Sequence, residues 1–197
     1  AVGSARRAAA PRLAAGVQGH LRELGLPAGR LEVRVGDVDP GDEVAFLLAA
    51  NPGEPPLPLA RVASGGELAR TMLALRLVLD EGQAPPTLVF DEVDAGIGGQ
   101  AALAVGRKLA ALAAAPVAVP RQVLVVTHLP QVAAFADSQL AVRKTERSGR
   151  AVADAGLVQG AERVAELSRM LSGHPESAAA RGHAEELLAV AARDRRA

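Results

Sequence analysis

Two adjacent carboxylates follow a short apolar run in the segment PPTLVFDEVDAGIGG. The run TLVF, residues 87–90, is typical of a buried parallel strand, and Asp91 and Glu92 come directly after it. Open α/β sheets bind ligands at the carboxyl ends of their strands. There Asp91 can hold Mg²⁺, usually through water, and Glu92 can polarise an attacking water. The alternative is a strand that ends in two solvated acids.

A second candidate site is the start of a helix in VASGGELAR. Ser64 and Glu67 have the spacing of a capping box, and Gly65 and Gly66 lie between them. Each glycine costs a helix about 1 kcal/mol relative to alanine. It also removes the side chain where backbone N–H groups point outward, and such bare groups bind phosphate. The alternative is that this motif only begins a helix.

A histidine ends the second apolar strand of the pattern, RQVLVVTH. The order strand, helix, strand over residues 87–128 is typical of a βαβ unit with parallel strands. His128 is therefore expected at the same sheet edge as Asp91 and Glu92. The alternative is an ordinary structural histidine.

The elements that must position these residues are predicted from apolar periodicity and turn residues. The helix from Gly65 carries an apolar stripe at Leu68, Met72, Leu75 and Leu79. The patterns predict helices over residues 6–25, 65–79, 98–115 and 177–192, and a further helix that ends at about residue 172. They predict strands over residues 87–90 and 121–128 and hairpins over residues 30–50 and 139–158. The predicted fold is α/β, with a mostly parallel sheet flanked by helices.

Composition excludes several classes of function. The chain has 197 residues, 49% of them hydrophobic, which is globular composition without a membrane-spanning run. It has no cysteine, so disulfides and thiolate metal sites are excluded, and only 2% aromatic residues, too few for base stacking. Nothing resembles an export signal, so the cytoplasm is expected.

Any contact with DNA must come from a local patch, because Lys plus Arg and Asp plus Glu both number 22. One basic group surrounds the turn predicted at Ser148-Gly149, and it consists of Arg143, Lys144, Arg147 and Arg150. It could touch DNA phosphates. A solvated hairpin is the favoured alternative, since Glu146 interrupts the group.

Taken together and in this order, the three motifs resemble the head of ABC-type ATPases, and most closely the SMC-like RecN family of DNA repair proteins. VASGGELAR resembles the signature motif, LVFDEVDAGIGG the Walker B strand with D-loop, and VTHLPQVAAFAD the H-loop, within a resemblance over residues 51–188. It implies that Asp91 holds Mg²⁺, that Glu92 activates water and that His128 senses the γ-phosphate of ATP. It also implies that ATP on the opposite head of a homodimer is bound by Ser64, Gly65, Gly66 and Glu67.

The chain departs from the family pattern in two places. The P-loop, G-x-x-x-x-G-K-S/T, is missing, because no glycine-lysine step occurs. Gly98 stands where ABC ATPases have the D-loop aspartate. In the family the P-loop lies in an N-terminal lobe beyond a long coiled coil. We therefore expect residues 26–197 to form the C-terminal lobe of the head, and residues 1–25 a coiled-coil stem end or junction.

The resemblance implies an ATPase that acts in DNA double-strand-break repair and is nucleoid-associated. Its expected partners are an N-terminal P-loop lobe, a second head and DNA, with no membrane. The chain alone is expected to be inactive. Two alternatives remain at this point: a fragment of an ABC transporter ATPase subunit, and a nonenzymatic interaction module with the same fold.

Overall fold

The computed structural model describes residues 1–61, 64–79, 85–115, 121–147, 150–174 and 176–195. The chain divides into two compact units, Ala1–Val126 and Thr127–Ala197. The first unit contains α1 (Val2–Glu23), β1 (Arg30–Val35), β2 (Val44–Ala49), β3 (Leu57–Pro58), a 3₁₀ turn (Leu59–Arg61), α2 (Gly65–Val78), β4 (Thr87–Phe90), α3 (Gly99–Ala114) and β5 (Gln122–Val125). The second contains α4 (Pro130–Ala133), β6 (Gln139–Arg147), β7 (Arg150–Val158), α5 (Gly160–Ser172) and α6 (Ala178–Asp194).

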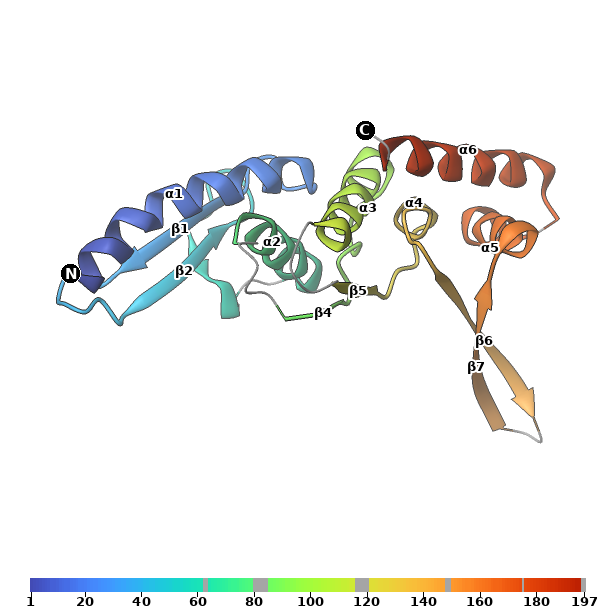
Figure 1. Ribbon diagram of the computed structural model, residues 1–197, viewed down its shortest axis with the longest axis horizontal. Coiled ribbons are helices and arrows are strands. Elements are labelled where there is room, and N and C mark those ends of the chain that lie inside the picture. Colours follow the sequence, from blue (N-terminus) through green and yellow to red (C-terminus); the bar gives the residue numbers. More distant parts are fainter. Residues whose placement is uncertain (62–63, 80–84, 116–120, 148–149, 175, 196–197) are drawn as a thin grey trace. The chain divides into compact units, whose positions relative to one another are not determined.

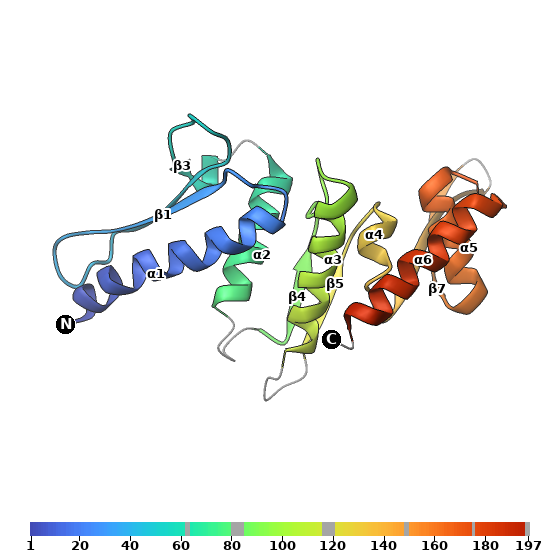
Figure 2. The same cartoon turned by 90° about the horizontal axis from the view of Figure 1, so that it is seen from above.

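The long first helix, α1, lies along the β1–β2 hairpin, as Figures 1 and 2 both show. Its apolar residues Val17 and Leu21 are fully buried, as the spacing of the sequence predicts. Gly16 lets α2 approach, because a Cβ there would lie 3.1 Å from Val78 Cγ1. The helix is therefore part of the core of the first unit, and its assignment as a coiled-coil stem stays a prediction.

Three strands form an antiparallel sheet in the order β1-β2-β3. The hairpin predicted from RLEVRV and EVAFLLAA is confirmed, with Arg30 opposite Ala49 and Val35 opposite Val44. Leu31 and Leu48 face each other across it, and both are buried. The short connection between β1 and β2 dictates the antiparallel arrangement, because a parallel pair needs a crossover of a dozen or more residues.

The βαβ unit predicted around the carboxylates is confirmed. β4 and β5 pair in parallel, with Val89 opposite Leu124, and α3 connects them. Among the described residues this is the only parallel pairing, and the other two sheets are antiparallel. The mostly parallel sheet of the sequence-based prediction is thus not confirmed.

The second unit is built from a hairpin and two helices that pack on each other. β6 and β7 are antiparallel with Gln139 opposite Val158, as predicted, whereas the turn expected at Ser148-Gly149 lies outside the described residues. α5 ends at Gly173, whose φ of 77° is the left-handed conformation that glycine adopts at low cost. Ser177 is the N-cap of α6, and its side chain accepts a hydrogen bond from the backbone N–H of Ala180.

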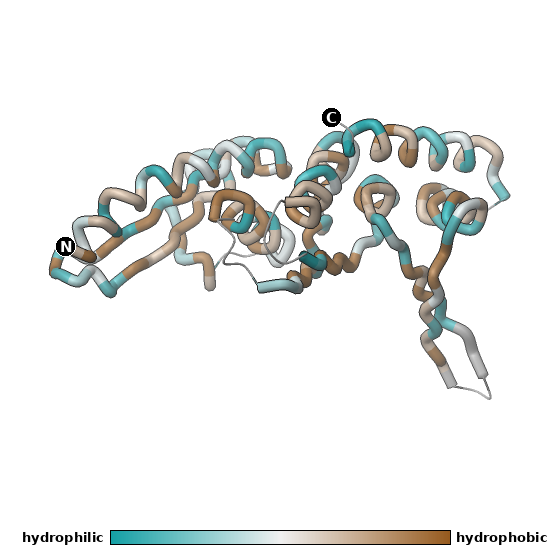
Figure 3. The backbone as a smooth tube through the Cα atoms, in the orientation of Figure 1, coloured by the Kyte–Doolittle hydropathy of each residue, from teal (hydrophilic) through white to brown (hydrophobic). Residues whose placement is uncertain are grey.

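Hydrophobic residues follow one another along β5 after Gln122 (Figure 3). In the part of the chain that the structure describes, no helix is both long and apolar enough to cross a membrane.

Candidate functional site

The start of α2 has the cap that the sequence predicts. Ser64 is extended, with φ −114° and ψ 125°, and its Oγ accepts the backbone N–H of Glu67 at 3.4 Å. Thr71 then donates its hydroxyl to the carbonyl of Glu67 at 2.8 Å. The first turn of α2 is therefore held by side chains on both sides of the glycine pair.

The two glycines of this turn face the loop that follows β4. A Cβ on Gly66 would lie 2.6 Å from the carbonyl oxygen of Ala95 and 3.0 Å from its Cβ. A Cβ on Gly65 would overlap Oε2 of Glu92. The sequence predicted that the glycines clear space for a partner's phosphate. The structure shows another reason for them, the close approach of the chain's own loop.

The loop after β4 presents both predicted carboxylates at the surface. Glu92 has a φ of 55°, rare for a residue other than glycine. Its N–H donates to Asp91 Oδ1 at 2.9 Å, and its carbonyl accepts the N–H of Ala95 at 3.0 Å. Val93 and Asp94 are buried beneath this turn. Asp91 and Glu92 are thus exposed side chains on an anchored backbone.

Arg70 joins α2 to this loop, and the sequence-based prediction missed it. It is only 4% exposed, and Nη1 donates to the carbonyls of Ala95 at 2.7 Å and Val93 at 3.4 Å. Burial lowers the pKa of Arg70, against the opposing charges of Glu67 and Asp94. An arginine holding two backbone carbonyls of the loop fixes its distance from the helix end.

One signal in the sequence pointed to Arg70: a charged residue stands four positions after Gly66 within a helix that packs on the core. The predicted apolar stripe of α2 hides it and is partly wrong. Leu75 is buried, whereas Met72 and Leu79 are exposed and the buried face includes Arg70 and Thr71.

His128 belongs to the second unit, two residues past the last bond between β4 and β5. That bond joins the N–H of Val126 to the carbonyl of Phe90 at 3.0 Å. His128 is exposed, and the turn around it is closed by the N–H of Leu129, which donates to Thr127 Oγ1 at 3.0 Å. The expected proximity of His128 to Asp91 and Glu92 stays a prediction.

The described residues contain no group of three histidine or acidic side chains that could hold a metal ion by themselves. A carboxylate such as Asp91 suits Mg²⁺, which commonly takes one or two protein carboxylates and fills its shell with waters and substrate phosphates. The binding of Mg²⁺ at Asp91 stays a prediction.

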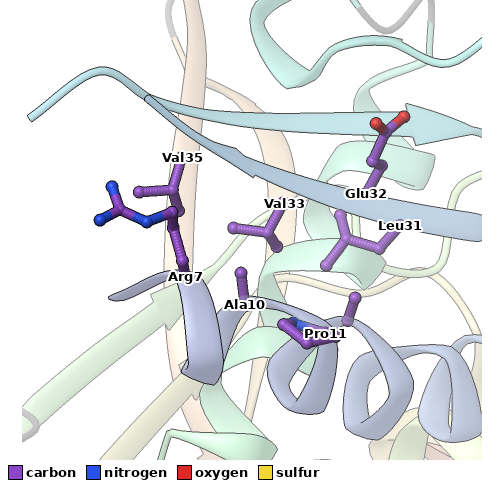
Figure 4. Close-up of a pocket in the computed structure, with 8 residues that line it drawn as sticks. Arg7, Ala10, Pro11, Leu31, Glu32, Val33 and Val35 are labelled. Atoms are coloured by element: carbon purple, nitrogen blue, oxygen red, sulfur yellow. The ribbon is translucent and has the colours of Figure 1, made fainter. Parts of the chain in front are cut away.

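A separate groove lies between α1 and β1 (Figure 4). Its wall includes Ala10, Pro11 and Val33, and Arg7 stands at one end. That arginine donates to the carbonyl of Gly36 at 2.8 Å and to Asp39 Oδ1 at 3.0 Å. Because its guanidinium already binds the chain's own loop, this groove adds nothing to the predicted site.

Comparison with known proteins shows what the whole chain is similar to. No protein-family model matches the chain. It is 18% identical to a protein described under ATP-driven dimerization and DNA-stimulated activation of SMC ATPases, with a TM-score of 0.54 over 86% of this chain and 98% of the other. The Smc head domain of Pyrococcus yayanosii matches with a TM-score of 0.56 at 20% identity, over 75% of this chain and 26% of the other. The fold is similar to that of SMC head domains.

Sequence relatives narrow this class. The chain is 47% identical to the DNA repair protein RecN of Streptomyces coelicolor, over 99% of this chain and 36% of that protein. It is 51% identical to RecN of Mycobacterium leprae over 86% of this chain and 27% of that protein, and 42% identical to RecN of Treponema pallidum over 97% and 34%. The chain is therefore homologous to RecN proteins over most of its own length, and it spans about a third of the length of these curated relatives.

Proposed function

We propose that this chain is the C-terminal lobe of a RecN ATPase head, and that the complete protein hydrolyses ATP in the repair of DNA double-strand breaks. The observation that carries the proposal is the anchored loop after β4. It holds Asp91 and Glu92 at the surface beside the glycine-opened end of α2. The RecN relatives support the role in DNA repair.

The bare face of the β4–β5 pair supports an N-terminal lobe as partner. Val89, Leu124 and Val126 lie on one face of this pair and are 66%, 46% and 62% exposed. Parallel sheets are normally covered on both faces. An N-terminal lobe that covers this face would also supply the P-loop that the chain lacks. We therefore expect the N-terminal lobe of the same protein to complete the nucleotide-binding site.

Each predicted site residue would then have its own role in ATP hydrolysis. Asp91 would hold Mg²⁺, which when bound neutralises charge on the phosphates. Glu92 would accept a proton from the attacking water, and His128 would contact the γ-phosphate. On the second head of a homodimer, γ-phosphate contacts would come from the start of α2: Ser64, Gly65, Gly66 and Glu67. Gly98, at the usual place of a D-loop aspartate, contributes no side chain to this step.

DNA is the remaining proposed partner, with the cytoplasmic nucleoid as the place of action. Of the basic group on the β6–β7 hairpin, Arg143 and Lys144 have exposed side chains, and those of Arg147 and Arg150 lie outside the described part of the chain. Asp154 stands opposite Arg143 across the strands and reduces the local charge. The hairpin is therefore a weak candidate for DNA contact.

The test uses a two-lobe protein, in which this chain is joined to an N-terminal P-loop lobe of a RecN relative. We expect ATP turnover by the two-lobe protein, none by this chain alone, and loss of turnover in the Glu92→Gln variant with nucleotide binding retained. Turnover by the isolated chain would refute the split site. Bound lobes without turnover would favour the nonenzymatic module. The transporter alternative is not supported by the RecN relatives.

A further inference from the structure

An arginine from α5 caps the C-terminal end of α4, the short helix that follows His128. Arg163 Nη2 donates to the carbonyls of Ala133 at 3.1 Å, Ala134 at 3.2 Å and Ala136 at 2.8 Å. Its Nε donates to Gln139 Oε1 at 3.3 Å. A helix leaves its last carbonyls without partners, and α4 is only one turn long. One guanidinium therefore satisfies the end of α4.

A second arginine, from α6, holds the same turn from another side. Arg195 Nη2 donates to the carbonyl of Ala136 at 3.2 Å, and its Nη1 pairs with Asp137 Oδ1 at 2.6 Å. Burial lowers the pKa of Arg163, and the charge of Arg195 acts in the same direction, while Asp137 opposes both. Two cations are thus placed close together to fix a single turn of backbone.

That turn adjoins His128, which lies two residues before the start of α4. The side chain of His128 is exposed. On one side its backbone is held by the bond from the N–H of Leu129 to Thr127 Oγ1. On the other side α4 begins at Pro130, which is buried, and its Val132 is only 4% exposed. A shift of α4 is therefore transmitted to His128 within two residues.

We propose that Arg163 is a positioning residue for His128, acting through the carbonyls of α4. The proposal rests on the function proposed above, in which His128 contacts the γ-phosphate. The hydrogen bonds that Arg163 donates to Ala133, Ala134, Ala136 and Gln139 lie within the second unit, Thr127–Ala197. Arg163 would contact neither nucleotide nor the attacking water, and its effect on catalysis would pass through the histidine.

The test is a double-mutant cycle in the two-lobe protein, with kcat and KM for ATP measured for His128→Ala, Arg163→Gln and the double variant. A misplacement of about 1 Å can cost 10²-fold in rate, so we expect Arg163→Gln to lower kcat roughly 10- to 100-fold with little change in KM. Both substitutions would disrupt the same contact, that between His128 and the γ-phosphate. The double variant should therefore be no slower than His128→Ala alone. Arg181→Gln, at an exposed site on α6, is the control and should leave kcat unchanged.

Thermal unfolding of each variant separates positioning from loss of fold. Should Arg163→Gln not fold, Arg163→Lys, which keeps the charge but not the fork of donors, takes its place in the cycle. Multiplicative effects in the double variant would overturn the proposal, as would normal turnover of the Arg163 variants alongside a slow His128→Ala. Normal turnover of His128→Ala itself would instead refute the role of His128, and with it the proposed function at this residue.

Discussion

Replacing Gly66 with alanine tests whether the start of α2 is built around its own chain. The new Cβ would meet the Ala95 carbonyl oxygen at 2.6 Å, and that oxygen is held by Arg70 at 2.7 Å. Overpacking of this kind costs about 1–3 kcal/mol, and the gain in helix propensity over glycine is about 1 kcal/mol. Because the obstacle is anchored backbone, the upper part of the cost applies. We expect a net loss of about 1–2 kcal/mol.

Gly65→Ala is the matched comparison. Its Cβ would meet only the end of the Glu92 side chain, which can rotate away, and Gly65 is exposed. We expect its free energy of unfolding to stay within about 0.5 kcal/mol of the parent.

Urea unfolding of the chain, followed by circular dichroism, measures both free energies. In a chain of this size about 1 kcal/mol corresponds to roughly 2–4 °C in Tm, which gives an independent check. Equal destabilisation by the two substitutions, or a Gly66→Ala variant more stable than the parent, would refute the close approach of α2 to the loop.

Three further predictions concern single residues. Arg70→Met should lower the free energy of unfolding by about 1–3 kcal/mol in urea, because it leaves buried carbonyls without a donor; an unchanged midpoint would contradict the role of Arg70. Burial, and to a smaller extent the charge of Lys108, lowers the pKa of His20 below its ordinary value of 6.5, whereas the charge of Glu23 acts in the opposite direction. The unfolded chain then binds the proton more readily, so stability should fall as pH drops from 6.5 toward the folded pKa, and His20→Gln should flatten this slope in melts from pH 7.5 to 5. Leu124→Glu should weaken binding of the N-terminal lobe in titration calorimetry without lowering the Tm of the chain alone; equal affinity would exclude the bare β4–β5 face as the contact.

Local pattern predicted most of the elements, although it missed β3 and α4 and extended β5 to His128. The βαβ unit, both hairpins and the helix cap at Ser64 follow from apolar periodicity and turn residues, which act over a few positions. The same reasoning misjudged the sheets, because the sequence does not say which strands lie side by side. It also misjudged the stripe of α2, where Met72 is exposed and Arg70 is buried.

By itself the sequence determined the motifs and their order, since Ser64 precedes α2, Asp91 and Glu92 follow β4, and His128 comes a few residues after β5. Only the tertiary structure decided that the glycine pair faces Ala95 and Glu92, and that Arg163 holds the turn after His128. These contacts join residues about 25 to 30 positions apart in the chain. They depend on how elements pack, and a spacing rule that spans a few residues carries no information about packing.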